Sequence, residues 1–404
     1  MTALEEHVDL FKADWIREPD LLAQRIHHAG VSDRYTAELA AWCAEVHEHL
    51  RNLADQLGIA LLLMGGNGTA LRFDAVRQRG SRDNDYLTAA TPTDIDSLIV
   101  LFGERFAALG ELMQPHRYEP KNPVRELPLA TYVVPVPLLL DHGYSSNNEV
   151  KLEFHFEDKL PAAEIVTGTL GPAATPKITA ALPELPYQIG LKLITLAAEP
   201  VGIEEPTRAA SVPRQMYDVD LLLTSMTERR WTALSDYVRE RYEHECALAG
   251  ITVQDGEPFD GIRARLQRWG DCLDESTGPW LTIRAAQQSG LQRRVHLRPW
   301  GWRARAYRLI LAIEALRIGA DGGVAWQKAS DLAELVPTSR AKAFRTPLAE
   351  LAGAAPRDLP VELRDFSWTA LVPGSTADLA KHLAHASQLL KQPSLPGAQA
   401  TDGK

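Results

Sequence analysis

The hydrophobic pattern near the start of the chain predicts a long amphipathic helix followed by a buried strand. Apolar residues recur at three- and four-residue steps over 35–57, and Gly58 follows, as expected at a helix end. Residues 59–64 are apolar throughout and are followed by two glycines, which is typical of a core strand running into a turn. Further helical patterns cover 69–77, one or two turns long, and 94–113.

A pair of strands is predicted at 131–140 and 149–158, because both stretches are rich in β-formers and the residues between them are turn formers. Apolar residues alternate with polar ones in the second strand, and successive strand residues point to opposite faces. The polar face therefore carries Lys151, Glu153 and His155.

Beyond this pair the pattern changes. The stretch 161–186, rich in Pro, Ala and Thr, has little periodicity and is predicted to be a connection to a second, mainly helical half. The helices expected there lie at 187–198, 214–225, 230–249 and 302–319. We therefore predict an α/β (α+β) fold with a domain of N-terminal helices and a small mixed sheet, a mainly helical domain and a disordered tail. These parts are expected at 1–185, 186–390 and 391–404.

Composition narrows the class of protein. The 404 residues are 45% hydrophobic and 24% charged, close to globular averages, which excludes collagenous, coiled-coil and wholly disordered chains. The net charge of −10 offers no overall attraction for nucleic acid, so any such contact must be local. Three widely spaced cysteines argue against a disulfide framework and a zinc knuckle. With no signal sequence or spanning stretch recognised, we expect a cytoplasmic protein without a membrane partner.

The residues with the clearest chemistry follow the predicted core strand. Gly80 and Ser81 come shortly before Asp83 and Asp85, two carboxylates that share one face if the segment is a strand. Carboxylates in this arrangement can share a hard divalent cation such as Mg²⁺. The unobstructed Gly-Ser backbone and the serine hydroxyl suit the terminal phosphates of a nucleotide. A solvated turn made of Asp and Asn is the alternative.

This G-S-x-x-D-x-D stretch resembles the polymerase-β-type nucleotidyltransferase superfamily. The G-G-x-x-T-A-L-R run before it, which contains Gly66, Thr69 and Arg72, is similar to the AbiEii/AbiGii-type family, which includes abortive-infection toxins and MenT toxins. The glycine turn here has two additional residues before Thr69 compared with the tighter family form. The similarity spans roughly residues 60–225 and implies that these three residues help to bind a nucleotide.

The resemblance also implies a third acid on a later strand, a lysine in a following helix and an aspartate at the start of another. The matching residues are Glu153, Lys192 and Asp218. Glu153 stands where the family has Asp, which moves its carboxylate outward by about one methylene. Glu153 could instead be a solvent-facing strand residue, Lys192 a snorkelling side chain, and Asp220 a competitor for the role of Asp218. Arg208 and Arg214 precede the aspartate and are candidates for neutralising a triphosphate.

The resemblance implies a catalyst that transfers a nucleoside monophosphate from an NTP to an acceptor hydroxyl and releases pyrophosphate. Mg²⁺ or Mn²⁺ would be the cofactor, a tRNA 3′ end the acceptor, and a cognate antitoxin protein a partner. In this reading Asp83, Asp85, Lys192 and Asp218 are catalytic, and Asp83, Asp85 and Glu153 bind the metal. A small-molecule or protein acceptor and a non-catalytic nucleotide-binding or partner-binding module remain the alternatives.

A second candidate segment, 292–308, interleaves arginines with aromatic residues. Arginine and aromatic side chains together can bind phosphates and stack on unpaired bases. The candidate RNA-binding residues are Arg293, Arg294, Arg298, Arg303 and Arg305. An amphipathic helix whose arginines pair with carboxylates is the alternative. Histidines, among them His155, lack metal-ligand spacing to one another and are assigned no metal role.

Overall fold

The computed structural model describes residues 3–119, 128–142, 148–171, 176–199, 201–227, 230–252, 258–271, 278–297 and 299–318. Two compact units are present. The first contains Met1–Gln188 and Ile283–His296, and the second contains Ile189–Thr282 and Leu297–Lys404. The predicted disordered tail, and every residue after 318, lie outside the described residues.

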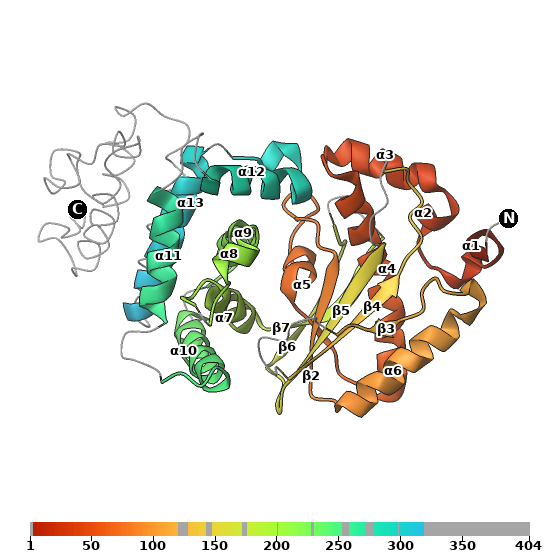
Figure 1. Ribbon diagram of the computed structural model, residues 1–404, viewed down its shortest axis with the longest axis horizontal. Coiled ribbons are helices and arrows are strands. Elements are labelled where there is room, and N and C mark those ends of the chain that lie inside the picture. The colour runs from red at the N-terminus through yellow and green to blue at the C-terminus, as the bar shows by residue number, and fades with distance from the viewer. Residues whose placement is uncertain are drawn as a thin grey trace, which may run out of the picture. The chain divides into compact units, whose positions relative to one another are not determined.

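The first unit contains a seven-stranded mixed sheet (Figure 1). Its spatial order is β3-β4-β5-β2-β1-β7-β6. The strands are β1 (Leu62–Leu63), β2 (Asp83–Thr88), β3 (His116–Arg117), β4 (Leu129–Pro135), β5 (Glu149–Phe156), β6 (Ala163–Gly168) and β7 (Ile178–Pro183). Two neighbouring pairs are parallel, β2 with β5 and β1 with β7, and the other four are antiparallel.

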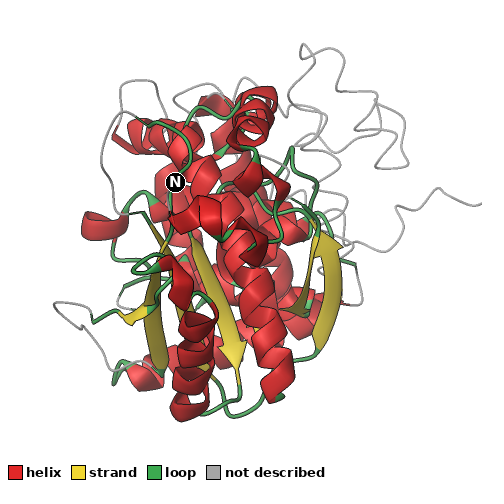
Figure 2. Cartoon of the chain, turned by 90° about the vertical axis from the view of Figure 1, so that its right-hand side faces the viewer, coloured by secondary structure: helices red, strands yellow, loops and turns green. Residues whose placement is uncertain are grey.

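Helices precede, interrupt and follow these strands (Figure 2). In the first unit they are α1 (Ala3–Glu6), α2 (Asp14–Arg17), α3 (Pro19–Ala29), α4 (Arg34–Leu57), α5 (Gly65–Leu71) and α6 (Pro92–Arg105). Later helices are α7 (Leu185–Thr195), α8 (Glu205–Arg208), α9 (Ser211–Leu223), α10 (Trp231–Leu248), α11 (Phe259–Asp271), α12 (Gly278–Gly290) and α13 (Pro299–Ile318). Single 3-10 turns lie at Val8–Leu10, Ala107–Leu109 and Arg293–Val295. The predicted α/β class with a helix-rich second half is confirmed.

The helix predicted at 35–57 is α4, which covers one face of the sheet. It starts where the Asp33 side chain accepts a hydrogen bond from Thr36 N at 3.1 Å, and it ends at Gly58 with a φ of 69°. Both features are standard helix boundaries, an N-cap side chain and a left-handed glycine. His47 of α4 stacks on Tyr86 of β2 with the ring centroids 5.9 Å apart, so alternate β2 residues face this helix.

The alternation predicted in the second strand is confirmed in β5, which lies between β4 and β2. Val150, Leu152 and Phe154 are fully buried, and Phe154 stacks on Tyr86 with centroids 5.4 Å apart. Lys151, Glu153 and His155 are partly exposed on the opposite face. The apolar side chains of β5 thus face α4, whereas its polar side chains lie on the same side of the sheet as α5.

The prediction for 161–186 is wrong, because this stretch forms strands β6 and β7 and the start of α7. Alternate β7 residues, Ile178, Ala180 and Leu182, are buried, but one of them is alanine and the hydrophobic signal is correspondingly weak. Its place in the sheet comes from parallel pairing with β1. The sheet is therefore larger than the small one predicted, and only Leu62–Leu63 of the apolar 59–64 run is in the ladder.

The four helices predicted in the second half are present as α7, α9, α10 and α13, and α8, α11 and α12 are additional to them. Trp231, Trp302 and Phe259 are large, fully buried side chains in this part of the chain. Ser235 of α10 donates a hydrogen bond to Leu316 O of α13 at 3.2 Å. Among the described residues, none of the helices is long and apolar enough to cross a bilayer.

Burial lowers the pKa of His47 to about 4, and this predicts acid sensitivity of the first unit. The unfolded chain takes up the proton near pH 6.5, whereas folded His47 resists it. Its contribution to stability is fully present above pH 6.5 and is lost as the pH falls toward 4. The loss is about 3 kcal/mol at most. Urea unfolding at several pH values should show a shallower acid slope for His47→Gln, which retains a polar partner for the Tyr86 hydroxyl, than for wild type.

The matched control is His28→Gln, since His28 is exposed on α3. Its unfolding free energy should follow the wild-type pH dependence. An unchanged slope in His47→Gln would contradict the expected contribution of His47.

Candidate active site

The parallel pairing of β2 with β5 determines which polar side chains meet. Asp83 is level with Lys151, Asp85 with Glu153, and Leu87 with His155. Because side chains directly across a ladder share a face, the carboxylates of Asp85 and Glu153 are neighbours. The third acid therefore lies beside the D-x-D motif, as the sequence predicted for Glu153.

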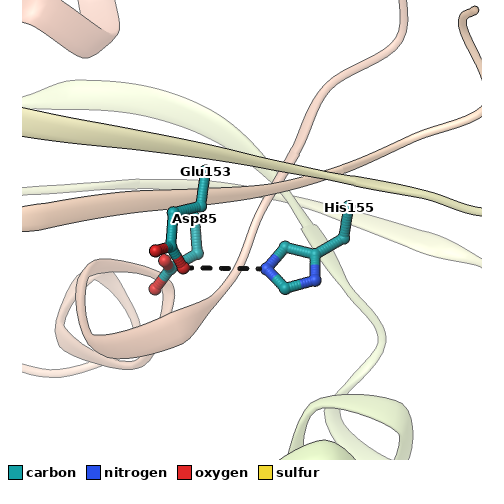
Figure 3. Close-up of side chains that lie close together, drawn as sticks. All are labelled: Asp85, Glu153 and His155. Atoms are coloured by element: carbon teal, nitrogen blue, oxygen red, sulfur yellow. Dashed lines mark ion pairs between the residues drawn. The ribbon is translucent and has the colours of Figure 1, made fainter. Parts of the chain in front are cut away.

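Asp85, Glu153 and His155 form a compact cluster of possible metal ligands (Figure 3). One ligand atom from each of them lies within 4.8 Å of the others. The Nε2 atom of His155 is 3.9 Å from Oε2 of Glu153. Asp83, the first residue of β2, is not part of this group among the described residues.

Lys151 offsets part of the carboxylate charge on this face. Lys151 donates a hydrogen bond to Oε1 of Glu153. Burial alone would raise the pKa of Glu153, but the charge and hydrogen bond of Lys151 hold it below its usual value. Loss of hydration and the charge of Glu153 raise the pKa of Asp83. Burial opposes the charge of Lys151, yet the neighbouring carboxylates, Glu153 first, raise its pKa.

Two glycines allow α5 to approach these side chains. Gly65 has a φ of +62°, and a Cβ there would lie 1.7 Å from Oδ2 of Asp85. A Cβ at Gly66 would lie 2.7 Å from both the Ser81 hydroxyl oxygen and Nη2 of Arg79. The Gly-Gly pair is thus required by close packing of the turn against the D-x-D and Gly-Ser motifs. The two additional residues before Thr69 continue the helix, and Gly68 lies against Leu63 O.

The Gly-Ser step is fixed by the protein on two sides. Gly80 N donates to Gly290 O at 2.9 Å, which ties this step to the segment 283–296 of the same unit. Ser81 is buried, and its carbonyl accepts a 3.7 Å contact from the Cys43 thiol. The Thr69 hydroxyl donates to Gly65 O at 2.9 Å and so braces the glycine turn. Ser81 and Gly66, both predicted to bind the nucleotide, lie close together.

Arg72, a predicted nucleotide ligand, has protein partners. Its Nε donates to Oε1 of Gln188 at 2.7 Å and its Nη2 to Pro183 O at 2.6 Å, while Nη1 pairs with Glu164. These contacts join the end of α5 to β6, β7 and the start of α7. In the structure Arg72 therefore connects α5 to neighbouring elements of the fold.

Lys192 and Asp218 form a buried ion pair in the second unit. The Lys192 ammonium lies 2.7 Å from Oδ2 of Asp218, and both side chains are almost fully buried. Gln215 accepts a longer hydrogen bond from Lys192 at 3.4 Å. The lysine and aspartate that the resemblance selected, 26 positions apart, are thus in direct contact.

The competing carboxylate, Asp220, has different partners. Arg305 Nε lies 2.8 Å from its Oδ2, and Arg308 also pairs with it. The guanidinium of Arg305 lies 4.9 Å from the ring centroid of Tyr217 and 4.4 Å from that of Trp302. Within this part of the arginine-aromatic segment, carboxylate pairing and aromatic stacking coexist.

The remaining basic candidates are spread over the described chain. Arg208 is exposed at the end of α8, and Arg214 is half-buried on α9. Arg293 is exposed, and its Nε is 3.3 Å from the Ser32 hydroxyl. The side chains of Arg294 and Arg303, and all of Arg298, lie outside the described residues.

Three residues of the site were missed by the sequence interpretation. His155 was assigned no metal role because it lacks a histidine partner, but its position two residues after Glu153 places it on the same strand face. Lys151, two residues before, was recognised only as a polar-face neighbour. Arg79 lies against Gly66 and Ser81, and its position next to the Gly-Ser step was the available signal.

The mixed sheet carries adjacent carboxylates beside a Gly-Gly turn and a buried serine, the arrangement expected of the nucleotidyltransferases that the sequence resembles. A family model described as nucleotidyl transferase AbiEii toxin, Type IV toxin–antitoxin system, matches residues 50–290, which is more than half of the chain. The chain belongs to this AbiEii family of nucleotidyltransferase toxins. The predicted resemblance and enzyme class are thereby confirmed.

Solved structures show a distant likeness. MenT4, a nucleotidyltransferase toxin from Mycobacterium tuberculosis H37Rv, is 14% identical with a TM-score of 0.43, over 79% of this chain and 99% of that one. JHP933 from Helicobacter pylori is 14% identical with a TM-score of 0.35, over 74% of this chain and 98% of that one. No curated protein matches the sequence.

The close approach at Gly65 predicts that Gly65→Ala is much more damaging than a matched glycine substitution. Gly58 has a similar positive φ but open space around its missing Cβ. Gly58→Ala should cost about 1 kcal/mol of unfolding free energy through backbone strain. Gly65→Ala adds a clash with Asp85, raising the cost to about 3 kcal/mol. Urea unfolding of both variants measures the difference, and equal costs would show that α5 does not pack against Asp85 in this way.

Proposed function

We propose that this protein transfers a nucleoside monophosphate from an NTP to the 3′ end of a tRNA and releases pyrophosphate. The observation that carries the transfer chemistry is the close packing of the Asp85 carboxylate, which lies beside Glu153, against the glycine turn next to Ser81. The tRNA acceptor, a cognate antitoxin protein and action in the cytoplasm, where NTP and tRNA occur, are suggested by the family resemblance.

The donor set at β2 and β5 fits a divalent cation. Two carboxylates and an imidazole converge within 4.8 Å, and carboxylate oxygens are the preferred ligands of Mg²⁺ and Mn²⁺. We assign Asp85 and Glu153 as metal ligands and Asp83 as a further acid of the site. When bound, the cation would neutralise phosphate charge and orient the phosphoryl groups.

The chain's own groups would hold the nucleotide. The Ser81 hydroxyl, which lies beside Gly66, would supply a hydrogen-bonding group for phosphate oxygens. Arg79 lies against the same turn and brings a positive charge to it. Charge neutralisation and positioning supply most of the catalysis in reactions of this kind.

We assign Lys192 to the phosphates of the nucleotide and Asp218 to the acceptor hydroxyl, which it would orient or deprotonate. Their 2.7 Å contact within the second unit fixes the direction of each side chain. Arg208 and Arg214 are proposed as additional phosphate contacts, and the arginines of 293–305 as RNA contacts.

Removing the Asp85 carboxylate should abolish transfer while leaving the fold intact. Purified protein is incubated with Mg²⁺ or Mn²⁺, each α-labelled NTP in turn and total tRNA, and labelled RNA is separated from labelled protein. Asp85→Asn should reduce label on RNA on the order of 10²-fold or more. Asp158→Asn, an exposed acid just after β5, is the control and should retain activity. Label on protein alone, or no label from wild type, would overturn the tRNA assignment.

The Lys192–Asp218 pair can be tested separately from its effect on stability. Lys192→Met alone removes the lysine charge that the buried Asp218 carboxylate contacts and should cost about 3–5 kcal/mol. The double variant Lys192→Met/Asp218→Leu removes both charges and should recover most of this stability. If the pair is catalytic, the double variant remains inactive when chemical denaturation shows it to be as stable as wild type. Recovery of transfer together with stability would show that the pair only supports the fold.

A further inference from the structure

The donor cluster contains a nitrogen ligand next to its two carboxylates. We propose that His155 coordinates the divalent cation directly and makes this centre prefer Mn²⁺ to Mg²⁺. This inference rests on the proposed metal-dependent function and concerns which of its two candidate cations the site prefers. Mg²⁺ is bound almost entirely through oxygen, whereas imidazole is a ligand of transition metals, and carboxylates suit Mn²⁺ as well.

The separation of the His155 and Glu153 ligand atoms agrees with a shared ion. The His155 Nε2 to Glu153 Oε2 distance is 3.9 Å, which is too long for a hydrogen bond. Two ligands held about 2.1 Å from one ion lie roughly 3.0 Å apart at a right angle and about 4.2 Å apart when opposite. The observed distance falls between these limits, and Figure 3 shows the imidazole facing the two carboxylates.

The two oxygens of Glu153 have separate neighbours. Oε1 accepts from Lys151, and Oε2 is the oxygen nearer to His155. Lys151 therefore fixes the carboxylate through one oxygen and leaves the other directed toward the imidazole and Asp85. This division makes the cluster of Asp85, Glu153 and His155 compatible with a cation while Lys151 stays in place.

The backbone positions of the ligands are rigidly fixed. β5 is hydrogen-bonded on both sides, to β2 and β4, and His155 is level with Leu87 on one side and Leu129 on the other. Glu153 and His155 are two residues apart on the same strand face. Ligands on interior strands are held more accurately than ligands on loops, so a bound metal would meet the imidazole with little rearrangement.

The test measures metal binding by the full chain without nucleotide or RNA. Metal-free protein is titrated with Mn²⁺ and Mg²⁺, and the Mn²⁺ complex is examined by pulsed electron paramagnetic resonance for coupling to a directly bound imidazole nitrogen. Wild type should show this coupling. The coupling should change when the histidine nitrogens are isotope-labelled, because it comes from the imidazole nitrogen. Mn²⁺ should bind about tenfold or more tightly than Mg²⁺.

His155→Asp replaces the nitrogen with an oxygen ligand. This variant should lose the nitrogen coupling, and its preference for Mn²⁺ should fall about tenfold. His116→Gln, an exposed substitution on β3 of the same sheet, should keep both. Because the wild-type spectrum answers the question on its own, a failure of the variant to fold does not remove the test.

Bound Mn²⁺ without nitrogen coupling in wild type, or an unchanged metal preference in a folded His155→Asp protein, would overturn the inference. Failure of the proposed function has a different signature. In that case the nitrogen coupling is present but no nucleotide is transferred to RNA. Metal binding and label transfer therefore separate the two.

Discussion

The register between β2 and β5 is the constraint on which the site depends. It sets Asp85 level with Glu153, and like charges directly opposite each other on a sheet are destabilising. Lys151 and His155, on the same face of β5, bring positive or metal-binding groups to both sides of Glu153. A shift of one residue would turn this whole set toward α4 and bring Phe154 to the polar side. The fully buried, stacked rings of Phe154 and Tyr86 oppose that shift.

The glycine turn depends on the same register. The space that a Cβ at Gly65 would need is filled by the Asp85 carboxylate, so α5 can start there only because position 65 is a glycine with positive φ. Arg72, at the end of α5, is bound to Gln188, Glu164 and Pro183 O. The start of α5 therefore fits against Asp85 because Gly65 has no side chain, and the end of α5 is fixed by the several hydrogen bonds of Arg72.

Local patterns predicted those elements whose signal lies within one segment. The helix ending at Gly58, the alternation in β5 and the D-x-D motif on β2 are of this kind. β6 and β7 escaped prediction because a short strand containing alanine is specified mainly by its neighbour, here β1. His155 was missed for a similar reason. Its partners are Asp85 on the neighbouring strand and Glu153 two residues before it, and the spacing between histidines detects neither of them.

The two carboxylates of α9 show how structure sharpens a choice that sequence left open. Asp218 and Asp220 are two residues apart, so their side chains point about 200° apart around the helix axis. Asp220 forms ion pairs with Arg305 and Arg308. Arg305 also packs on Tyr217 and Trp302, so these contacts connect α9 to α13. Asp218 meets Lys192 instead. A buried ion pair adds little stability compared with apolar residues of similar volume. The different partners of the two carboxylates therefore favour Asp218 over Asp220 as the aspartate of the proposed reaction.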